Sequence, residues 1–176
     1  SDGGAVAGLS DAAGAARAAR AGSPVPVLGS GVHPRAILGE FASAVYGTDT
    51  FPAKLYGVTG TNGKTSVMYL LAELLRAAGV VAGLSSTAER RVGDEVIPSN
   101  LTSPEASELH GLLARMGEAG VNGVAIEVSA QAVVRHRLDG VHFDVVAFNN
   151  FSQDHLDEFG EIEPYFAAKL QWSTPA

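Results

Sequence analysis

The chain has 176 residues, of which 46% are apolar and 18% are charged, a composition that excludes an intrinsically disordered protein. Its formal net charge of −7 argues against a general attraction to nucleic acid or anionic lipid, and no uninterrupted apolar run approaches the roughly 20 residues of a membrane span. The lack of cysteine excludes disulfides and thiolate metal sites, and it fits the cytoplasmic location that we expect.

The first fifty residues indicate a small α/β segment. Residues 11–21 have the apolar spacing of a helix, residues 25–28 indicate a strand, and Pro34 begins a second helical pattern. The turn-rich stretch 47–52 separates this segment from the remainder. A chain of this length accommodates one domain plus a fragment of another, so we place a domain boundary at about residue 50.

From residue 54 onward, predicted strands and helices alternate. The expected strands are 55–59, 80–84, 121–128 and 143–148, and the expected helices are 65–78, 104–119, 130–137 and 161–171. This alternation predicts an α/β fold with a mostly parallel sheet flanked by helices on both faces. The apolar runs 121–126 and 143–148 favour interior strands. Because such sheets bind ligands beyond the carboxyl ends of their strands, the residues that follow each strand are candidate site residues.

The segment 57–67, GVTGTNGKTSV, lies between the first of these strands and a helix. A glycine-rich turn at a helix N-terminus offers free backbone N–H groups and the positive end of the helix dipole to an anion. Lys64 adds a full charge, and the Thr65 hydroxyl has the position of a Mg²⁺ ligand in phosphate loops. Val58 stands where the standard spacing has glycine, so this loop is a variant. It predicts nucleoside triphosphate binding, and a plain strand-to-helix turn is the alternative.

Three further residues are candidates for metal binding or catalysis. Glu127 directly follows a buried strand, where a carboxylate holds Mg²⁺ in many nucleotide-binding sheets, although a solvent-facing carboxylate also fits. His155 lies among carboxylates after the next strand, and a solvated or structural histidine is its alternative. Lys169, on the last helix, by itself indicates a solvated lysine.

Two pairs of polar residues are candidates for substrate binding. Thr102 and Ser103 offer two hydroxyls, but they also fit a helix entry in which Ser103 is the N-cap. Arg135 and Arg137 are either surface charges or a bidentate clamp on an anionic substrate.

Taken together, these motifs resemble a known family. The segments GVTGTNGKTSV, LTSPEASELHGLL, AIEVSAQAVVRHRLDGVHFD, FNNFSQDHLDEFG and YFAAK have the order and spacing of the Mur ligases of bacterial cell-wall synthesis. The resemblance covers about residues 34–170. It is strongest to the members that add the third amino acid, L-lysine or meso-diaminopimelate, to UDP-MurNAc-L-Ala-D-Glu in peptidoglycan synthesis. It implies an ATP-dependent amide ligase that works through an acyl phosphate.

The resemblance also implies roles for individual residues of this chain. The implied ATP-binding residues are Gly60, Thr61, Asn62, Gly63, Lys64, Thr65 and Ser66. The implied Mg²⁺ ligands are Thr65, Glu127, His155 and a carbamylated Lys169, and the implied catalytic residues are Lys64, Glu127, His155 and Lys169. The implied substrate-binding residues are Thr102, Ser103, Ser129 and Arg137. A carbamylated lysine carries a carboxylate-like group that approaches a metal ion, whereas an ammonium repels it.

The chain departs from the family pattern at three places, one of which is the Thr-Ser-Val that ends the phosphate loop in place of the commoner Thr-Thr-Thr. Ala130 and Gln131 replace the usual Ser-His, and Arg135 stands where glutamine or a small residue is common. The resemblance further implies three domains. We expect residues 1–50 to be the C-terminal part of an N-terminal UDP-binding domain and 51–176 an incomplete central ATP-binding domain. A C-terminal amino-acid-binding domain is then absent, and the chain alone is expected to be inactive.

The expected partners are ATP, Mg²⁺, UDP-MurNAc-dipeptide and a diamino acid, with no nucleic acid or membrane partner, and the expected state is a monomer. Two alternatives remain at this point. One is a synthetase of the folylpolyglutamate or cyanophycin type. The other is a nucleotide-binding module without ligase chemistry, which the replacement at Gln131 suggests.

Overall fold

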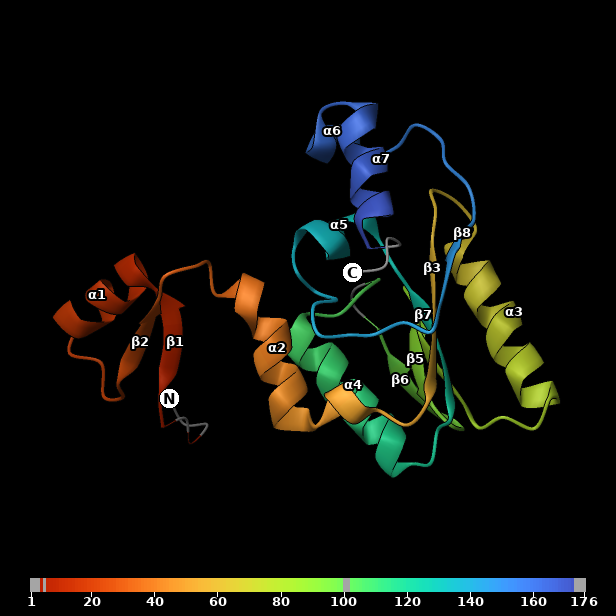
Figure 1. Cartoon of the computed structure of the whole chain (residues 1–176), viewed down its shortest axis with the longest axis horizontal. Helices are drawn as coiled ribbons and strands as arrows, with labels where there is room; N and C mark the ends of the chain where they lie inside the picture. The colour runs from red at the N-terminus through yellow and green to blue at the C-terminus, as the bar shows by residue number, and fades with distance from the viewer. Residues whose placement is uncertain (1–3, 5, 100–101, 173–176) are drawn as a thin grey trace.

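The computed structural model describes residues 4, 6–99 and 102–172 (Figure 1). The strands are β1 (Gly8–Asp11), β2 (Val27–Ser30), β3 (Lys54–Thr59), β4 (Ala82–Ser85), β5 (Glu89–Val92), β6 (Glu95–Pro98), β7 (Gly123–Glu127) and β8 (Val145–Phe148). The helices are α1 (Ala12–Arg20), α2 (Arg35–Tyr46), the 3-10 helix η1 (Thr48–Thr50), α3 (Lys64–Ala77), α4 (Ala106–Glu118), α5 (Ala130–Val134), α6 (Leu156–Phe159) and α7 (Ile162–Gln171). No helix in these ranges has the length and apolar character required to cross a lipid bilayer.

The N-terminal segment forms a small parallel sheet of its own. β1 and β2 pair in parallel, and α1 is the crossover between them. Asp11 begins this helix as its N-cap, because its carboxylate accepts a hydrogen bond from the backbone N–H of Gly14 at 2.6 Å. α2 then leads to the larger unit and packs along α4, as Figure 1 shows.

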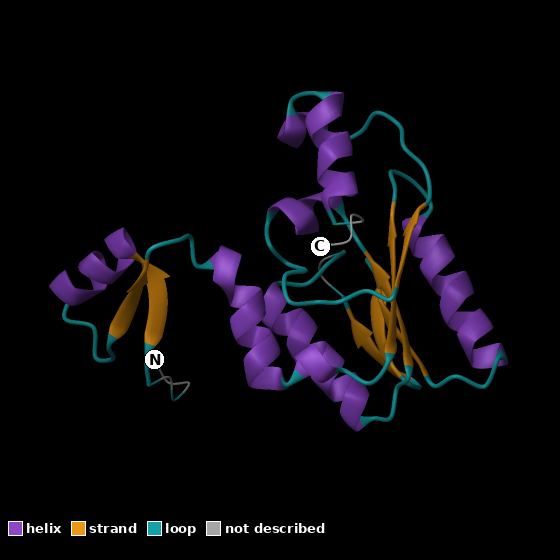
Figure 2. Ribbon diagram, viewed as in Figure 1, coloured by secondary structure: helices purple, strands orange, loops and turns teal. Residues whose placement is uncertain are grey.

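The larger unit is a six-stranded sheet in the order β6-β5-β4-β7-β3-β8. β4, β7, β3 and β8 are parallel, whereas β5 and β6 form an antiparallel hairpin at one edge. Helices lie on both faces of this sheet (Figure 2). The predicted α/β fold with a mostly parallel sheet is therefore confirmed.

The alternation of side chains along β7 explains the two apolar layers. Val124 and Ile126 point to one face and join a core cluster with Leu109 and Leu113 of α4. Ala125 points to the other face and joins a cluster that holds Met68 and Ala72 of α3, together with Val58 and Leu84 from the neighbouring strands. Because both faces are covered, β7 is buried at every position, and its carboxyl end is held rigidly.

Two predictions about the sheet were wrong. The sequence pattern predicted no strands between 85 and 120, yet β5 and β6 form a hairpin there around Gly93, whose φ of 59° suits a tight two-residue turn. The segment 143–148 was expected to be interior, but β8 pairs only with β3 among the described residues, and Val145 is 51% exposed. The apolar side chains of β8 are exposed in the part of the chain that the structure describes. β1 and α6 were also not predicted.

Candidate active site

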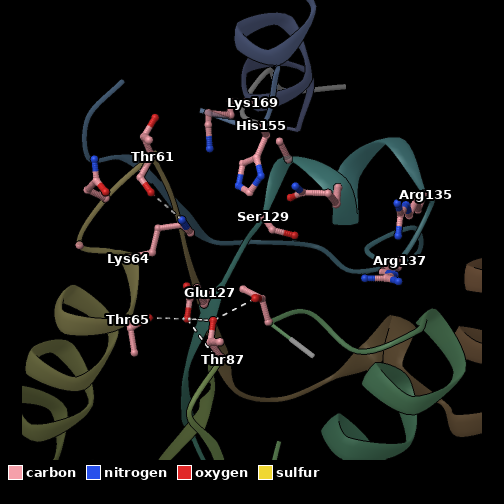
Figure 3. Close-up of a pocket in the computed structure, with 15 residues that line it drawn as sticks. Thr61, Lys64, Thr65, Thr87, Glu127, Ser129, Arg135, Arg137, His155 and Lys169 are labelled. Carbon is pink, nitrogen blue, oxygen red and sulfur yellow. Dashed lines mark hydrogen bonds between the residues drawn. The ribbon is translucent and has the colours of Figure 1, made fainter. Parts of the chain in front are cut away.

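A cavity of about 460 Å³ opens at the carboxyl ends of β3 and β7. Most of the predicted site residues line it: Thr61, Asn62, Gly63, Lys64, Thr65, Thr102, Glu127, Ser129, Arg137, His155 and Lys169. Figure 3 shows side chains from the phosphate loop, β7 and the α6–α7 region directed toward the same space. Gly60, Ser66 and Ser103 are not among its lining residues. Segments that are far apart in sequence thus meet at one edge of the sheet, as expected for a parallel α/β fold.

The phosphate loop joins β3 to the N-terminus of α3. Gly63, with φ of 76°, is the N-cap of α3. The N–H groups of the first turn of α3 have no partner within the helix and point toward the cavity. The segment after β8 supports the loop, because Thr61 N–H donates to the Asn150 carbonyl at 3.0 Å and Asn62 N–H donates to the Asn150 side chain at 2.9 Å. Gly60 has φ of 151°, which residues with side chains rarely adopt, and a Cβ there would lie 3.1 Å from the Asn150 backbone, so glycine is favoured here. Asn150 was not among the predicted site residues.

Two lysines converge on the phosphate loop. The Lys64 ammonium donates to the carbonyls of Gly60 and Thr61, both at 3.0 Å, and the Lys169 ammonium donates to the Gly60 carbonyl at 2.7 Å. Lys169 is 1% exposed and lies 4.6 Å from the ring centre of Tyr165. Burial, together with repulsion from Lys64, lowers the pKa of Lys169 to about 8. The solvated lysine that the sequence alone indicated is therefore wrong.

Glu127 is 2% exposed, so the solvent-facing carboxylate that was its alternative is also wrong. Its Oε2 atom accepts hydrogen bonds from the Thr65 hydroxyl at 3.1 Å, the Thr87 N–H at 2.9 Å and the Thr87 hydroxyl at 3.1 Å. The Thr87 hydroxyl also lies 3.0 Å from Thr102 Oγ1, within hydrogen-bond distance. Thr87, which follows β4, thus links the carboxylate to a predicted substrate-binding residue. Its position after a strand was the signal available in the sequence.

The donor set around Glu127 fits Mg²⁺. This ion uses one or two protein carboxylates and hydroxyls and takes its other ligands from phosphate oxygens and water. Glu127 and Thr65 supply such a pair, and both line the cavity next to the phosphate loop. Among the described residues, no three histidine or acidic side chains lie close enough together to hold a metal ion by themselves. The site therefore fits a metal that arrives with a phosphate ligand.

His155 lies at the opposite wall of the cavity. It has φ of 53° and stands at the N-cap position of α6, and its Nε2 atom is 3.6 Å from the Asp154 carboxylate. Its ring makes an edge contact with Tyr165 at 5.7 Å between centroids. The Tyr165 hydroxyl donates to Thr61 Oγ1 at 3.3 Å. Tyr165 thus contacts His155, Lys169 and the phosphate loop at once.

The arginines differ in their surroundings. Arg137 is 8% exposed, and its guanidinium contacts the Glu105 carboxylate at 2.9 Å and the Ser103 carbonyl at 3.4 Å. Arg135 is half exposed and pairs with Glu158 at 2.6 Å. Both arginines line the cavity.

Glu105 is the carboxylate that holds Arg137, and Arg35 of α2 also pairs with it at 2.6 Å. Burial alone would raise the pKa of Glu105, but the hydrogen bond from Arg35 and the charge of Arg137 outweigh burial and lower it. Glu105 is the N-cap of α4, so the capping role considered for Ser103 is wrong. The Ser103 hydroxyl instead donates to the Glu127 carbonyl at 3.0 Å, whereas Ser129 caps α5 through the Ala132 N–H.

Residues 58–173 match the family described as the Mur ligase middle domain. The chain belongs to the Mur ligase family. A UDP-N-acetylmuramyl-tripeptide synthetase of Leifsonia xyli is 56% identical over 170 residues, which are 97% of this chain and 32% of that protein. A UDP-N-acetylmuramoyl-L-alanyl-D-glutamate--2,6-diaminopimelate ligase of Streptomyces avermitilis is 46% identical over 98% of this chain and 33% of its own length. The chain therefore spans about a third of the length of these Mur ligases.

Solved structures show the same fold. A UDP-N-acetylmuramoyl-L-alanyl-D-glutamate--2,6-diaminopimelate ligase superposes with a TM-score of 0.75 at 24% identity, over 94% of this chain and 37% of that one. The E. coli FolC protein in complex with ADP superposes with a TM-score of 0.58 at 22% identity, over 76% of this chain and 38% of that one.

Proposed function

We propose that the protein containing this chain is an ATP-dependent amide ligase. It adds L-lysine or meso-diaminopimelate to UDP-MurNAc-L-Ala-D-Glu during peptidoglycan synthesis. The observation that carries this proposal is the single cavity lined by Lys64, Glu127, His155 and Lys169 beside a phosphate loop. The names of the relatives from Leifsonia xyli and Streptomyces avermitilis support the choice of substrate.

The residues of the cavity suit phosphoryl transfer by positioning and charge, without a protein nucleophile. The N–H groups of the phosphate loop hold the ATP phosphates, and Lys64 turns from the loop carbonyls to the β and γ oxygens. Thr65 and Glu127 would hold one Mg²⁺ and His155 would hold a second, and these ions would neutralise charge on the phosphates. The substrate carboxylate attacks the γ-phosphorus, and the bond to ADP breaks. The amine of the incoming amino acid then displaces phosphate from the acyl phosphate, loses a proton and forms the amide.

We propose that Lys169 acts as a carbamate. The neutral amine adds CO₂ and releases one proton, and a pKa of about 8 makes that neutral form accessible near physiological pH. The burial of Lys169 protects the adduct from water, and the nearby Lys64 ammonium offsets its negative charge. The anionic carbamate would then be able to hold a metal ion as a further ligand.

The wider assignments rest on the same proposal. Residues 1–50 belong to a UDP-binding domain and 51–176 to the central ATP-binding domain, and a further domain selects the amino acid. Thr102, Ser103, Ser129 and Arg137 contact the UDP-muramyl peptide. The enzyme is a cytoplasmic monomer.

The proposal is tested by ADP release from the full-length protein. We expect release to require both UDP-MurNAc-L-Ala-D-Glu and a diamino acid, and the Glu127→Ala variant to lose at least about a hundredfold in kcat, as is usual for electrostatic stabilisation of a transition state. A Glu118→Ala variant, at an exposed position on α4, serves as the control. ADP release that is independent of both substrates, or saturation by folate in place of the UDP-sugar, would contradict the proposal.

A further inference from the structure

His110 is a buried histidine that lies outside the cavity. It is on α4, is 0% exposed and joins two other parts of the chain. Its Nδ1 atom is 2.5 Å from the hydroxyl of Thr48 in η1, and its Nε2 atom is 2.9 Å from the carbonyl oxygen of Asp139. The Thr48 hydroxyl is in turn 3.3 Å from the Ser43 hydroxyl of α2. The imidazole therefore connects the segment before β3 to the segment after α5.

The chemistry of these contacts defines the role of each nitrogen. A carbonyl oxygen only accepts hydrogen bonds, so Nε2 carries the proton that is donated to Asp139. In the neutral ring, Nδ1 is then the acceptor for the Thr48 hydroxyl. Replacement by an apolar residue would leave both partners unpaired in a buried place, which costs more than the hydrogen bonds themselves contribute.

The backbone around Asp139 approaches α2 so closely that a side chain would not fit between them. A Cβ on Gly39 of α2 would lie 2.2 Å from the Asp139 carbonyl oxygen. Gly140 has φ of 78°, and a Cβ there would lie 2.9 Å from the Gly39 carbonyl oxygen and 3.1 Å from His110 Nε2. α2, α4 and the segment 137–141 thus meet in a close junction at His110.

The same segment carries Arg137, two residues before Asp139. Its guanidinium lines the cavity and is held by Glu105 at the start of α4. α4 therefore holds the segment at two points, Glu105 with the Arg137 side chain and His110 with the Asp139 backbone. Glu105 and His110 are five residues apart at the start of α4. The segment 137–141 is therefore held at both of its contacts with the same helix.

We infer that His110 is a positioning residue, which fixes the 137–141 segment and thereby places Arg137 at the cavity. This inference rests on the proposed function, in which Arg137 contacts the anionic UDP-muramyl peptide. His110 does not touch the cavity, so its effect on substrate binding is transmitted through the backbone of residues 137–139. ATP binding, which uses the phosphate loop on the other side of the cavity, is independent of it.

The test compares His110→Leu with His110→Gln in the full-length protein. Glutamine offers one N–H donor for Asp139 and one oxygen acceptor for Thr48, whereas leucine offers neither. We expect His110→Leu to raise the KM for UDP-MurNAc-L-Ala-D-Glu roughly three- to tenfold, the range for the one buried hydrogen bond that it loses to the 137–141 segment, with the KM for ATP unchanged. His110→Gln should restore most of the loss. Gly39→Ala, which keeps the imidazole but crowds Asp139, should raise the same KM.

Met116→Ala is the matched control, because Met116 is equally buried on α4 but packs toward Gly83 of β4. It should lower thermal stability without changing the KM for the UDP-sugar. Amide hydrogen exchange gives a readout that does not depend on activity. His110→Leu should speed exchange at the N–H groups of Arg137 and Val141, which are hydrogen-bonded within this part of the chain, and Met116→Ala should not.

The outcomes separate this inference from the proposed function. Faster exchange at 137–141 together with the selective rise in KM supports it. Unchanged exchange in the segment, or equal effects on the KM values for ATP and the UDP-sugar, overturns it. Wild-type protein that does not use the UDP-sugar refutes the proposed function, whereas the exchange data still decide whether His110 positions the segment.

Discussion

The oxygen atoms of Glu127 are used unequally. Oε2 accepts three hydrogen bonds, all from Thr65 and Thr87, and these fix the plane of the carboxylate. A carboxylate held in this way needs little rearrangement when a cation binds to it. Thr87 contributes most to the orientation of the Glu127 carboxylate, because both its N–H and its hydroxyl donate to Oε2.

The first prediction concerns Thr87. Thr87→Val keeps the shape and the backbone N–H but removes the hydroxyl bonds to Glu127 and Thr102. We expect the Mg²⁺ concentration that gives half-maximal ADP release to rise roughly ten- to a hundredfold, since a part-buried hydrogen bond to a charged group is lost. Thr87→Ser, which retains the hydroxyl, is the control and should resemble the wild type. An unchanged Mg²⁺ requirement in Thr87→Val would show that Thr87 has no role in Mg²⁺ binding.

At the scale of elements, the edge strand β8 is joined to β3 before their ladder begins. Asp144 accepts a hydrogen bond from the Lys54 ammonium at 2.6 Å and another from the Leu55 N–H at 2.8 Å. β8 carries the segment 149–152 that supports the phosphate loop, so its placement affects the cavity. The Asp144 contacts therefore connect a surface ion pair to the geometry of the active site.

The second prediction is a pH dependence of stability. The hydrogen bond from Lys54, followed by that from Leu55, lowers the pKa of Asp144. A lowered carboxyl pKa contributes stability that is fully present above the unfolded-state pKa, about 3.9, and is lost as the pH falls through the folded-state value. Asp144→Asn should therefore have a lower urea midpoint than the wild type at pH 7, and the difference should shrink below about pH 4.

The measurement for Asp144 is a series of urea unfolding curves between about pH 7 and pH 3, a range that spans the unfolded-state pKa. Asp94→Asn is a suitable control, because Asp94 is exposed and lies 3.9 Å from its partner Arg76, so it should have little effect at any pH. If the difference between Asp144→Asn and the wild type grows as the pH falls, the expected direction is wrong.

At the scale of the whole molecule, the proposed nucleotide site draws on segments from most of the larger unit. The loop before α3, the end of β7, the segment after β8 and α7 all contribute groups to one cavity. A ligand that binds this assembled site and not the unfolded chain stabilises the fold by mass action.

The third prediction is thermal stabilisation by ATP with Mg²⁺. At about a hundred times the dissociation constant, the free energy of unfolding should rise by about 2.7 kcal/mol, with a matching rise in Tm. Lys64→Ala should abolish most of this rise at the same ligand concentration, because the charge opposite the phosphates is lost. Arg115→Ala removes a charge from an exposed position on α4, outside the cavity, and should leave the rise intact. An equal rise in wild type and Lys64→Ala would contradict a nucleotide site at this loop.

The sequence by itself determined the features that depend on local pattern. The alternation of apolar runs predicted the parallel α/β sheet, because the interior strands of such a sheet are buried on both faces. The sequence also located the phosphate loop and the side chains that follow each strand, because the carboxyl ends of parallel strands lie at one edge of the sheet, where ligands bind. Lys64, Glu127 and His155 were found in this way.

Only the tertiary structure decided which distant groups face one another. The burial of Lys169 depends on the loop that covers it, and Arg137 is oriented by Glu105, which is 32 residues away. The edge position of β8 depends on which strands pair with it, and the contacts of His110 depend on the packing of α2 against α4. Periodicity records whether a residue is apolar, but burial, hydrogen-bond partners and the resulting pKa of a charged group arise from contacts between segments that the chain brings together only on folding.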